Sequence, residues 1–247
     1  MFDLKKILNI LLVAGIFAAI VLFSINRLDY NFVWEGVYTY KNKLIKGFMI
    51  TLLISSCSML VSLVIGVVST ILLNSQILVL NYLVRGYIGL IRGTPFLVQI
   101  YFLYYIIATA LNISNKYILG ILILSVFSGA YVTEIIRGGL ESIDKTQHLT
   151  AKALGFTTLQ KYVYVIIPQV IKRILPALTG QMSSLIKDSS LLSVIAVSEF
   201  TMNVLEVDSI NFRTFENLTV LGLGYLLITI PISQISKKLE RKFNYEA

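Results

Sequence analysis

Apolar runs of about 20 residues, separated by shorter polar segments, recur along this chain. A helix of that length crosses the hydrocarbon core of a bilayer. The pattern predicts six spans, at about residues 7–25, 47–73, 93–111, 117–136, 176–197 and 218–235. The expected fold class is therefore an all-α integral membrane protein with about six transmembrane helices.

The first apolar run, 7–25, follows Lys5 and Lys6. A cleaved signal peptide is the alternative to a membrane anchor. The run is longer than the usual core of a signal peptide, and no clear cleavage pattern follows it. We therefore expect residues 1–45 to form an anchor helix with an external connection, and residues 46–247 to form the main transmembrane domain.

The connections between the runs differ in character. Residues 74–92 are less apolar and are expected to form an amphipathic connection along the membrane surface. Residues 112–116 contain Asn and Ser and predict a short turn. The longest connection, about 138–175, is basic and amphipathic, so it is expected to form structure outside the lipid. Pro168 and Pro176 are expected to mark where this connection leaves the surface and where the chain re-enters the membrane.

Composition excludes other classes of protein. Of the 247 residues, 56% are hydrophobic and 14% are charged, whereas a soluble domain has about 25% charged residues. The net charge of +8 could suggest nucleic acid, but the cations flank apolar runs, as is typical of membrane topology. If the chain crosses the membrane at each predicted span in turn, most lysines and arginines fall on the side that carries both chain ends. We therefore expect no nucleic-acid partner, with both termini and the basic connection in the cytoplasm.

The sequence does not contain the residues for several kinds of catalytic site. No glycine is followed by lysine, so the phosphate-binding loop GxxxxGK[ST] is missing, and the chain is not expected to bind ATP in that way. His148 is the only histidine and Cys57 the only cysteine, which favours neither a zinc cluster nor an intrachain disulfide. We expect no catalytic residue, metal or cofactor in this chain.

Two stretches of the basic connection, 146–154 and 158–166, suit short helices, with Gly155 between them. Glycine can adopt the left-handed conformation that ends a helix, and Thr157 or Thr158 can cap the second helix. Small side chains leave part of the first helix bare, which permits close approach by another protein. An ordinary surface loop is the alternative, and spacing alone does not decide between the two.

This connection resembles the conserved cytoplasmic loop of ABC importer permeases, in which an EAA triplet is followed by a glycine and later by a Leu-Pro pair. In that family the loop forms a coupling helix seated in the ATPase subunit. The matching positions are Gln147, Ala151, Gly155, Ile167 and Pro168. Leu149 stands where the family has its glutamate. Either the partner is apolar at that point, or this subunit couples more weakly than a second permease.

Four further segments resemble the polar amino-acid permeases, the group for histidine, glutamine, arginine and opines. They are GFMITL at 47–52, RGTPFLVQ at 92–99, AYVTEIIRGG at 130–139 and IKDSSLLSVI at 186–195. The site residues carried over from these segments include Arg92, Gly93, Thr94, Pro95, Glu134 and Arg137. The resemblance runs from about residue 46 to the C-terminus. It implies the five-helix core of a type I importer, with 7–25 as an additional helix.

The resemblance implies a permease subunit of an ATP-driven importer for polar amino acids in a bacterial inner or plasma membrane. Its partners would be ABC ATPase subunits, a second permease, an extracytoplasmic solute-binding protein and the lipid bilayer. ATP and Mg would be bound by the ATPase. A permease for another small solute shares the architecture, and a freestanding channel or ion-driven carrier is the alternative from another class.

Ionisable groups inside apolar runs are costly, so each one is a functional candidate. Glu134 and Arg137 are three residues apart on one helix face and are expected to pair. Arg92 is expected to pair with an acid on a neighbouring helix, which the sequence does not identify.

Lys187 and Asp188 are adjacent in the most polar of the predicted spans, so they point in different directions. With Ser189 and Ser190 they are expected to line the translocation pathway, because a span that polar must face a partner subunit or water. Glu199, at the outer end of the same span, is expected to be an ordinary solvated charge. Contact with a cationic substrate or with the binding protein is its alternative role.

Overall fold

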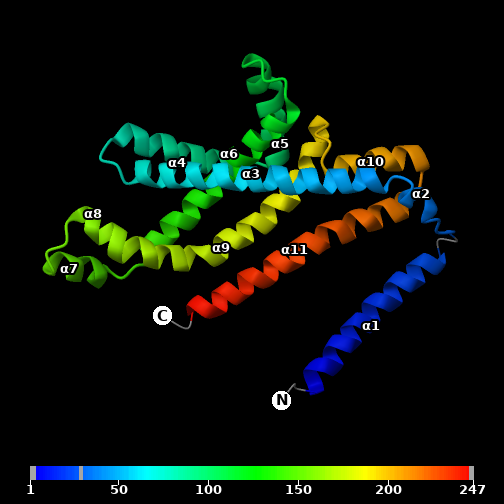
Figure 1. Ribbon diagram of the computed structural model, residues 1–247, viewed down its shortest axis with the longest axis horizontal. Coiled ribbons are helices and arrows are strands. Elements are labelled where there is room, and N and C mark those ends of the chain that lie inside the picture. Colours follow the sequence, from blue (N-terminus) through cyan, green and yellow to red (C-terminus); the bar gives the residue numbers. More distant parts are fainter. Residues whose placement is uncertain (1–3, 28–29, 245–247) are drawn as a thin grey trace.

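The computed structural model describes residues 4–27 and 30–244, and all regular structure in these ranges is helical (Figure 1). The α-helices are α1 (Leu4–Arg27), α2 (Glu35–Tyr38), α3 (Lys41–Leu73), α4 (Leu78–Gly93), α5 (Phe96–Phe102), α6 (Lys116–Glu141), α7 (Lys145–Ala153), α8 (Thr158–Gln160), α9 (Ile167–Asp188), α10 (Phe200–Asn211) and α11 (Thr214–Asn244). Two π-helices, η1 (Leu103–Ala108) and η2 (Lys161–Ile166), and a 3₁₀-helix, η3 (Ser189–Ile195), complete the fold. The predicted all-α class is confirmed.

The part of the chain that the structure describes contains four helices long and apolar enough to cross a membrane. They are Lys41–Leu73, Lys116–Glu141, Thr158–Ile195 and Thr214–Phe243. The helix α4 and the segment Phe96–Ala108, with a bend of 115° between them, are either a broken fifth span or a re-entrant loop. In α1, the apolar residues Leu11–Arg27 form a shorter helix. The exact count of six therefore stays a prediction.

The centre of the fold is the packing of α3 against α6. Small residues line this contact, as they do where helices approach closely in membranes. Ser58 Oγ donates to the carbonyl of Ile121, and Ser62 Oγ to that of Ser125, both at 3.2 Å. A Cβ atom on Gly66 would collide with Val132. The hydroxyls of Ser58 and Ser62 thus donate to carbonyls across the contact, whereas the buried Ser55 Oγ has no hydrogen-bond partner among the described residues.

The segment expected as a surface connection, 74–92, is instead mostly the helix α4. It buries Val84, Ile88 and Ile91 and packs against α3 and α6. Arg92, one of the two arginines that suggested a surface position, pairs with a carboxylate on α6.

Neither proline in the basic connection marks the boundary expected of it. Pro168 lies in the first turn of α9, and Pro176 is inside the same helix. Because η2 runs directly into α9, Pro168 also lies inside the longer helix Thr158–Ile195, directly after its π-helical turn. The fifth predicted span therefore begins well before residue 176, and α9 continues directly from the segment that holds α7 and α8.

The helix α10 and the early start of α11 were not expected. Two residues in the connections of α10 have left-handed backbones: Ala196 (φ 56°), between η3 and α10, and Phe212 (φ 53°), between α10 and α11. These turns bring α10 against α3 and α11. Glu216, at the start of α11, accepts from Tyr30 Oη at 2.8 Å and from the Val33 N–H at 2.6 Å. The chain that follows α1 is thereby fixed to α11.

Candidate functional site

The basic connection forms the two short helices that its sequence predicts, α7 and α8 with η2, at one end of the molecule (Figure 1). Asp144 caps α7 by accepting from the Thr146 N–H at 2.8 Å, and this hydrogen bond holds the pKa of Asp144 below its usual value. Gly155 has a φ of +77°, as expected for a glycine that ends a helix. Thr157 caps α8 in a capping box with Gln160.

The two faces of α7 have different roles. Ala151 is only 2% exposed, because α7 packs against η2. Ala151 is one of the small residues expected to leave α7 bare for another protein, but it permits close packing within the chain instead. Leu149, 66% exposed, lies on the opposite side of the helix at 3.6 residues per turn. Gln147 and Gly155 are also exposed.

The loop is joined to the membrane helices by a small core. Ile166, which is fully buried, packs with Ile143 and Val170. Arg173 on α9 donates to the carbonyl of Ser142, just before α7. Ile167 and Pro168, the residues matched to the family pattern, are exposed at the start of α9. Movement of α7 is thus tied to α6 and α9.

Charged residues of α4 and α6 form a connected network of ion pairs near the same end of the molecule. Arg92 Nη1 lies 2.6 Å from Glu134 Oε2, and Arg137 Nε lies 2.9 Å from Glu134 Oε1. Arg137 Nη1 also contacts Glu141 Oε1 at 2.7 Å. The predicted pairing of Glu134 with Arg137 is confirmed, and Glu134 is the acid that the sequence could not identify for Arg92.

The segment Gly93, Thr94 and Pro95 is the break between α4 and α5. Gln99 Nε2 donates to the carbonyls of Ile91 at 2.8 Å and Thr94 at 3.0 Å. These carbonyls lie at the end of α4, where the last C=O groups of a helix have no N–H partner within the helix. Sequence reasoning missed Gln99, although a polar side chain in an apolar run at a proline was the available signal.

The four polar pathway candidates are consecutive at the junction of α9 and η3. Lys187 is exposed and Asp188 is half-buried, and neither forms an ion pair within the described residues. Ser189 and Ser190 donate to the backbone carbonyls of Ile186 and Lys187, at 2.7 and 2.6 Å. The adjacent charges thus remain available to groups outside this chain.

Glu199 is fully buried, so the expectation of a solvated charge is wrong. Its carboxylate caps α10, accepting from the N–H groups of Thr201 at 2.9 Å and Met202 at 2.8 Å. It also accepts from Tyr225 Oη at 3.1 Å and Thr51 Oγ1 at 3.2 Å. Donors from three helices replace water around this anion.

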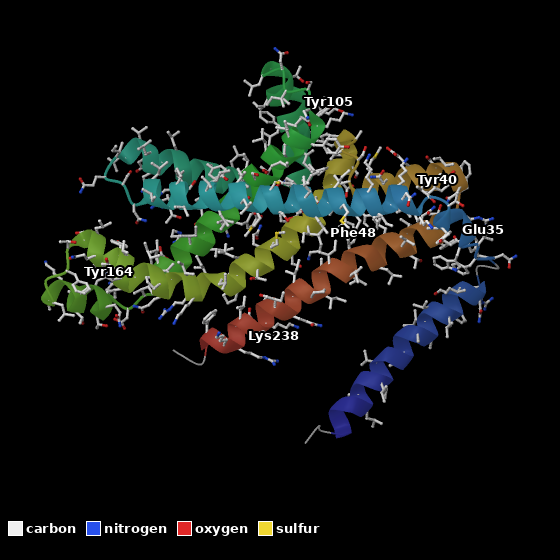
Figure 2. All side chains as sticks on the ribbon, viewed as in Figure 1. Glu35, Tyr40, Phe48, Tyr105, Tyr164 and Lys238 are labelled. Atoms are coloured by element: carbon white, nitrogen blue, oxygen red, sulfur yellow. The ribbon has the colours of Figure 1, made fainter. Side chains whose placement is uncertain are left out.

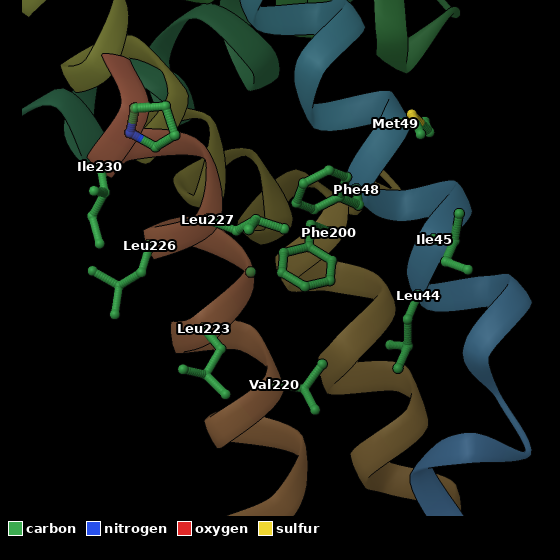
Figure 3. A pocket seen from close by; sticks show the side chains of 12 residues that line it. Leu44, Ile45, Phe48, Met49, Phe200, Val220, Leu223, Leu226, Leu227 and Ile230 are labelled. Carbon is green, nitrogen blue, oxygen red and sulfur yellow. The ribbon is translucent and has the colours of Figure 1, made fainter. Parts of the chain in front are cut away.

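The candidate residues do not form one site. The helices α7 and α8 lie at one end of the molecule and α10 at the other (Figure 1). An apolar groove of about 840 Å³ separates parts of α3, α10 and α11, and Figure 3 shows Phe48, Phe200 and Leu227 around it. None of the polar candidates lines it. The described residues also contain no group of three or more His, Cys, Asp or Glu able to hold a metal.

Comparisons with known proteins agree on one family. Residues 62–245 match the model described as "Binding-protein-dependent transport system inner membrane component". The glutamine transport system permease protein GlnP of Escherichia coli K12 is 34% identical over 214 residues, which cover 86% of this chain and 98% of GlnP. The arginine transport system permease protein ArtQ of Bacillus subtilis is 29% identical over 200 residues, covering 81% and 91%.

Solved structures give the same result. A crystal structure of an amino acid ABC transporter with histidines matches with a TM-score of 0.79 and 30% identity, covering 86% of this chain and all of that one. The MetNI methionine ABC transporter, in an inward-facing conformation, matches with a TM-score of 0.69 and 19% identity, covering 81% and 95%. At that identity the second likeness concerns the fold alone.

Proposed function

The chain belongs to the binding-protein-dependent transport system inner membrane components, the permease subunits of ABC importers, and we propose that its cargo is polar amino acids. The carrying observation is the relationship to permeases named for glutamine and arginine, which spans nearly their whole length. The permease itself is a transport component and not an enzyme.

The energy for transport would come from a separate ATPase that binds ATP and Mg. This proposal is supported by the missing GxxxxGK[ST] loop in this chain and by a folded loop that exposes Leu149 at one end of the molecule. An extracytoplasmic solute-binding protein would deliver the amino acid. A second permease, either the same chain or a related one, would complete the pathway.

The proposed topology places both termini and the α7–α8 loop in the cytoplasm of a bacterial inner membrane. Support comes from the lysines and arginines, which gather near the loop and the end of α11. Within this arrangement we assign Lys187 and Asp188, with Ser189 and Ser190, to the translocation pathway. Their support is that an uncompensated charge within a span needs a partner outside its own helix.

Reconstituted vesicles test coupling to the ATPase. The permease, its ATPase and its binding protein would be assayed for glutamine uptake and ATP hydrolysis. Gly155→Trp should lower the uptake per ATP hydrolysed by about tenfold or more, because a bulky residue with a strained backbone would displace α7. Gly155→Asn is the matched control, since Asn tolerates the left-handed conformation. Uptake by the permease alone, without any ATPase, would favour the channel or carrier instead.

A second experiment tests the pathway assignment. Asp188→Ala should abolish uptake while the variant still assembles with its ATPase. Glu206→Ala, which removes a half-exposed carboxylate paired with Lys43 at 2.5 Å, is the control and should keep most of the uptake. Full uptake in Asp188→Ala would refute the assignment.

A further inference from the structure

The helix α11 is longer than the membrane requires. Its 31 residues extend over about 46 Å, whereas the hydrocarbon core is about 30 Å thick. No charged residue lies between Glu216 and Lys237, so this interval fills the hydrocarbon. The last two turns of α11 therefore lie at the level of the phospholipid headgroups.

Those last turns are strongly basic. Lys237, Lys238, Arg241 and Lys242 are all exposed, and none forms an ion pair within the described residues. Glu240 is the one acid between them. Figure 2 shows Lys238 near the free end of α11, with its side chain pointing away from the bundle. This surface attracts an anion.

The cations continue an apolar stripe on the same face of α11. Leu227, Pro231, Ile235, Lys238 and Lys242 are spaced by three or four residues, so they lie along one side of the helix. Leu227 is 70% exposed and Ile235 is 52% exposed. One face thus offers hydrocarbon contact first and positive charge at its end.

The stripe borders the apolar groove between α3, α10 and α11. Leu227, Ile230 and Pro231 line this groove, together with Phe48 and Met49 of α3 (Figure 3). Lys238 is seven residues beyond Pro231, a rise of about 10 Å along the helix. That separation fits a molecule with an apolar tail in the groove and a charged head at the helix end.

A cation near the start of α9, Arg173, adds to the positive charge at this end of the molecule. Ser236 Oγ on α11 donates to the Pro176 carbonyl on α9 at 2.9 Å, and Arg173 lies one helical turn before Pro176. Arg173 contacts a backbone carbonyl, that of Ser142, so no carboxylate among the described residues neutralises it. The contact between Ser236 and Pro176 thus joins the basic end of α11 to a part of α9 that also carries an exposed cation.

We propose that this face binds an anionic phospholipid, with acyl chains along the groove and the Leu227–Ile235 stripe and the phosphate on Lys238 and Lys242. The apolar stripe ending in cations favours a lipid over an acidic protein surface, since long basic side chains reach headgroups while their stems cover hydrocarbon. The proposal goes beyond transport and does not require the assigned cargo.

The test uses the full chain in lipid nanodiscs containing equal amounts of phosphatidylglycerol and phosphatidylcholine, with retained lipid identified by native mass spectrometry. The wild-type chain should retain phosphatidylglycerol preferentially. The double variant Lys238→Gln with Lys242→Gln should lower that preference by about tenfold, while Lys238→Arg with Lys242→Arg should keep it. Lys41→Gln with Lys46→Gln, at the start of α3 and so level with the first turns of α11 rather than with its last, is the matched control and should leave the preference unchanged.

Three outcomes would overturn the proposal. Equal retention of both lipids by the wild-type chain would remove the headgroup preference. Displacement of the lipid by inorganic phosphate would indicate a site for a free anion. If Lys238→Gln with Lys242→Gln keeps the lipid but no longer co-purifies with an ATPase, these cations bind a protein partner instead. Folding of each variant is checked independently by its thermal unfolding.

Discussion

Arg92 on α4 donates to Glu134 on α6 at 2.6 Å across 42 residues of sequence. The same carboxylate accepts from Arg137 at 2.9 and 3.0 Å. One acid therefore holds two cations and joins the bent α4–α5 unit to the helix that leads into the α7–α8 loop. Loss of Glu134 would leave two arginines without their main partner.

We expect Glu134→Gln to lower the free energy of unfolding by about 1–3 kcal/mol, since charged hydrogen bonds to a half-buried group are lost. Thermal unfolding of the purified permease measures this. Glu141→Gln is the control. The Glu141 side chain is 62% exposed and forms one ion pair, with Arg137, so this variant should lose less than about 1 kcal/mol of stability. Equal effects from both variants would contradict the central role of Glu134.

The buried Glu199 gives a second prediction. Glu199→Ala leaves the Tyr225 and Thr51 hydroxyls and the cap of α10 without their acceptor, so it should destabilise the permease by about 1–3 kcal/mol. Glu199→Gln keeps one acceptor oxygen and should cost less. The measurement is hydrogen exchange of α10 amides, which should increase in the alanine variant. Unchanged exchange would show that α10 is held by its apolar contacts alone.

Two adjacent glycines at the end of α6 provide a matched pair. A Cβ atom on Gly139 would collide with Ile174 of α9, whereas one on Gly138 meets nothing within 4 Å. We expect Gly139→Ala to destabilise the protein by about 1–3 kcal/mol through overpacking. Gly138→Ala should be neutral or stabilise it by up to about 1 kcal/mol. Denaturant unfolding of both variants would reveal the difference, and matching midpoints would contradict it.

The exposed Leu149 allows a test of whether the ATPase presents an apolar surface to α7. A carboxylate placed on this exposed position would lose its water against an apolar partner, so Leu149→Glu should weaken binding of the ATPase by about tenfold or more. Leu149→Met keeps the apolar character and serves as the control. Binding is measured in detergent with the purified ATPase. Tighter binding by the glutamate variant would instead mean that the ATPase keeps a cation for the family's usual residue.

The stability of α7 should depend on pH through the Asp144 carboxylate that caps it. Its lowered pKa means that the cap contributes stability above the unfolded pKa, and that this contribution is lost as the pH falls through the folded pKa. We therefore expect α7 to be capped at neutral pH and to fray in acid. Asp144→Asn should remove the acid dependence, and Asp144→Ala should fray α7 already at neutral pH. Hydrogen exchange of α7 amides across a pH series checks all three expectations.

The sequence predicted the loop better than the membrane domain around it. Gly155 and Thr157 act through local backbone rules, so their roles follow from the residues themselves. Glu199 does not, because burial of a carboxylate depends on donors that arrive from α3 and α11. The partner of Arg92 is equally remote in sequence. Residues 74–92 were misread because two arginines suggested water, whereas the helix they belong to packs on α3 and α6.

The contacts between α3 and α6 share one spacing. Ser58 meets Ile121, Ser62 meets Ser125 and Thr70 meets Thr133, each pair 63 residues apart. A constant offset means that the two helices run parallel in a fixed register. A slip by a single residue would break all three contacts between the helices, although Ser62 and Thr70 also donate to carbonyls within α3, at 2.7 and 2.8 Å. We therefore expect this pair of helices to resist sliding and to move as one unit when the permease alternates between its two sides.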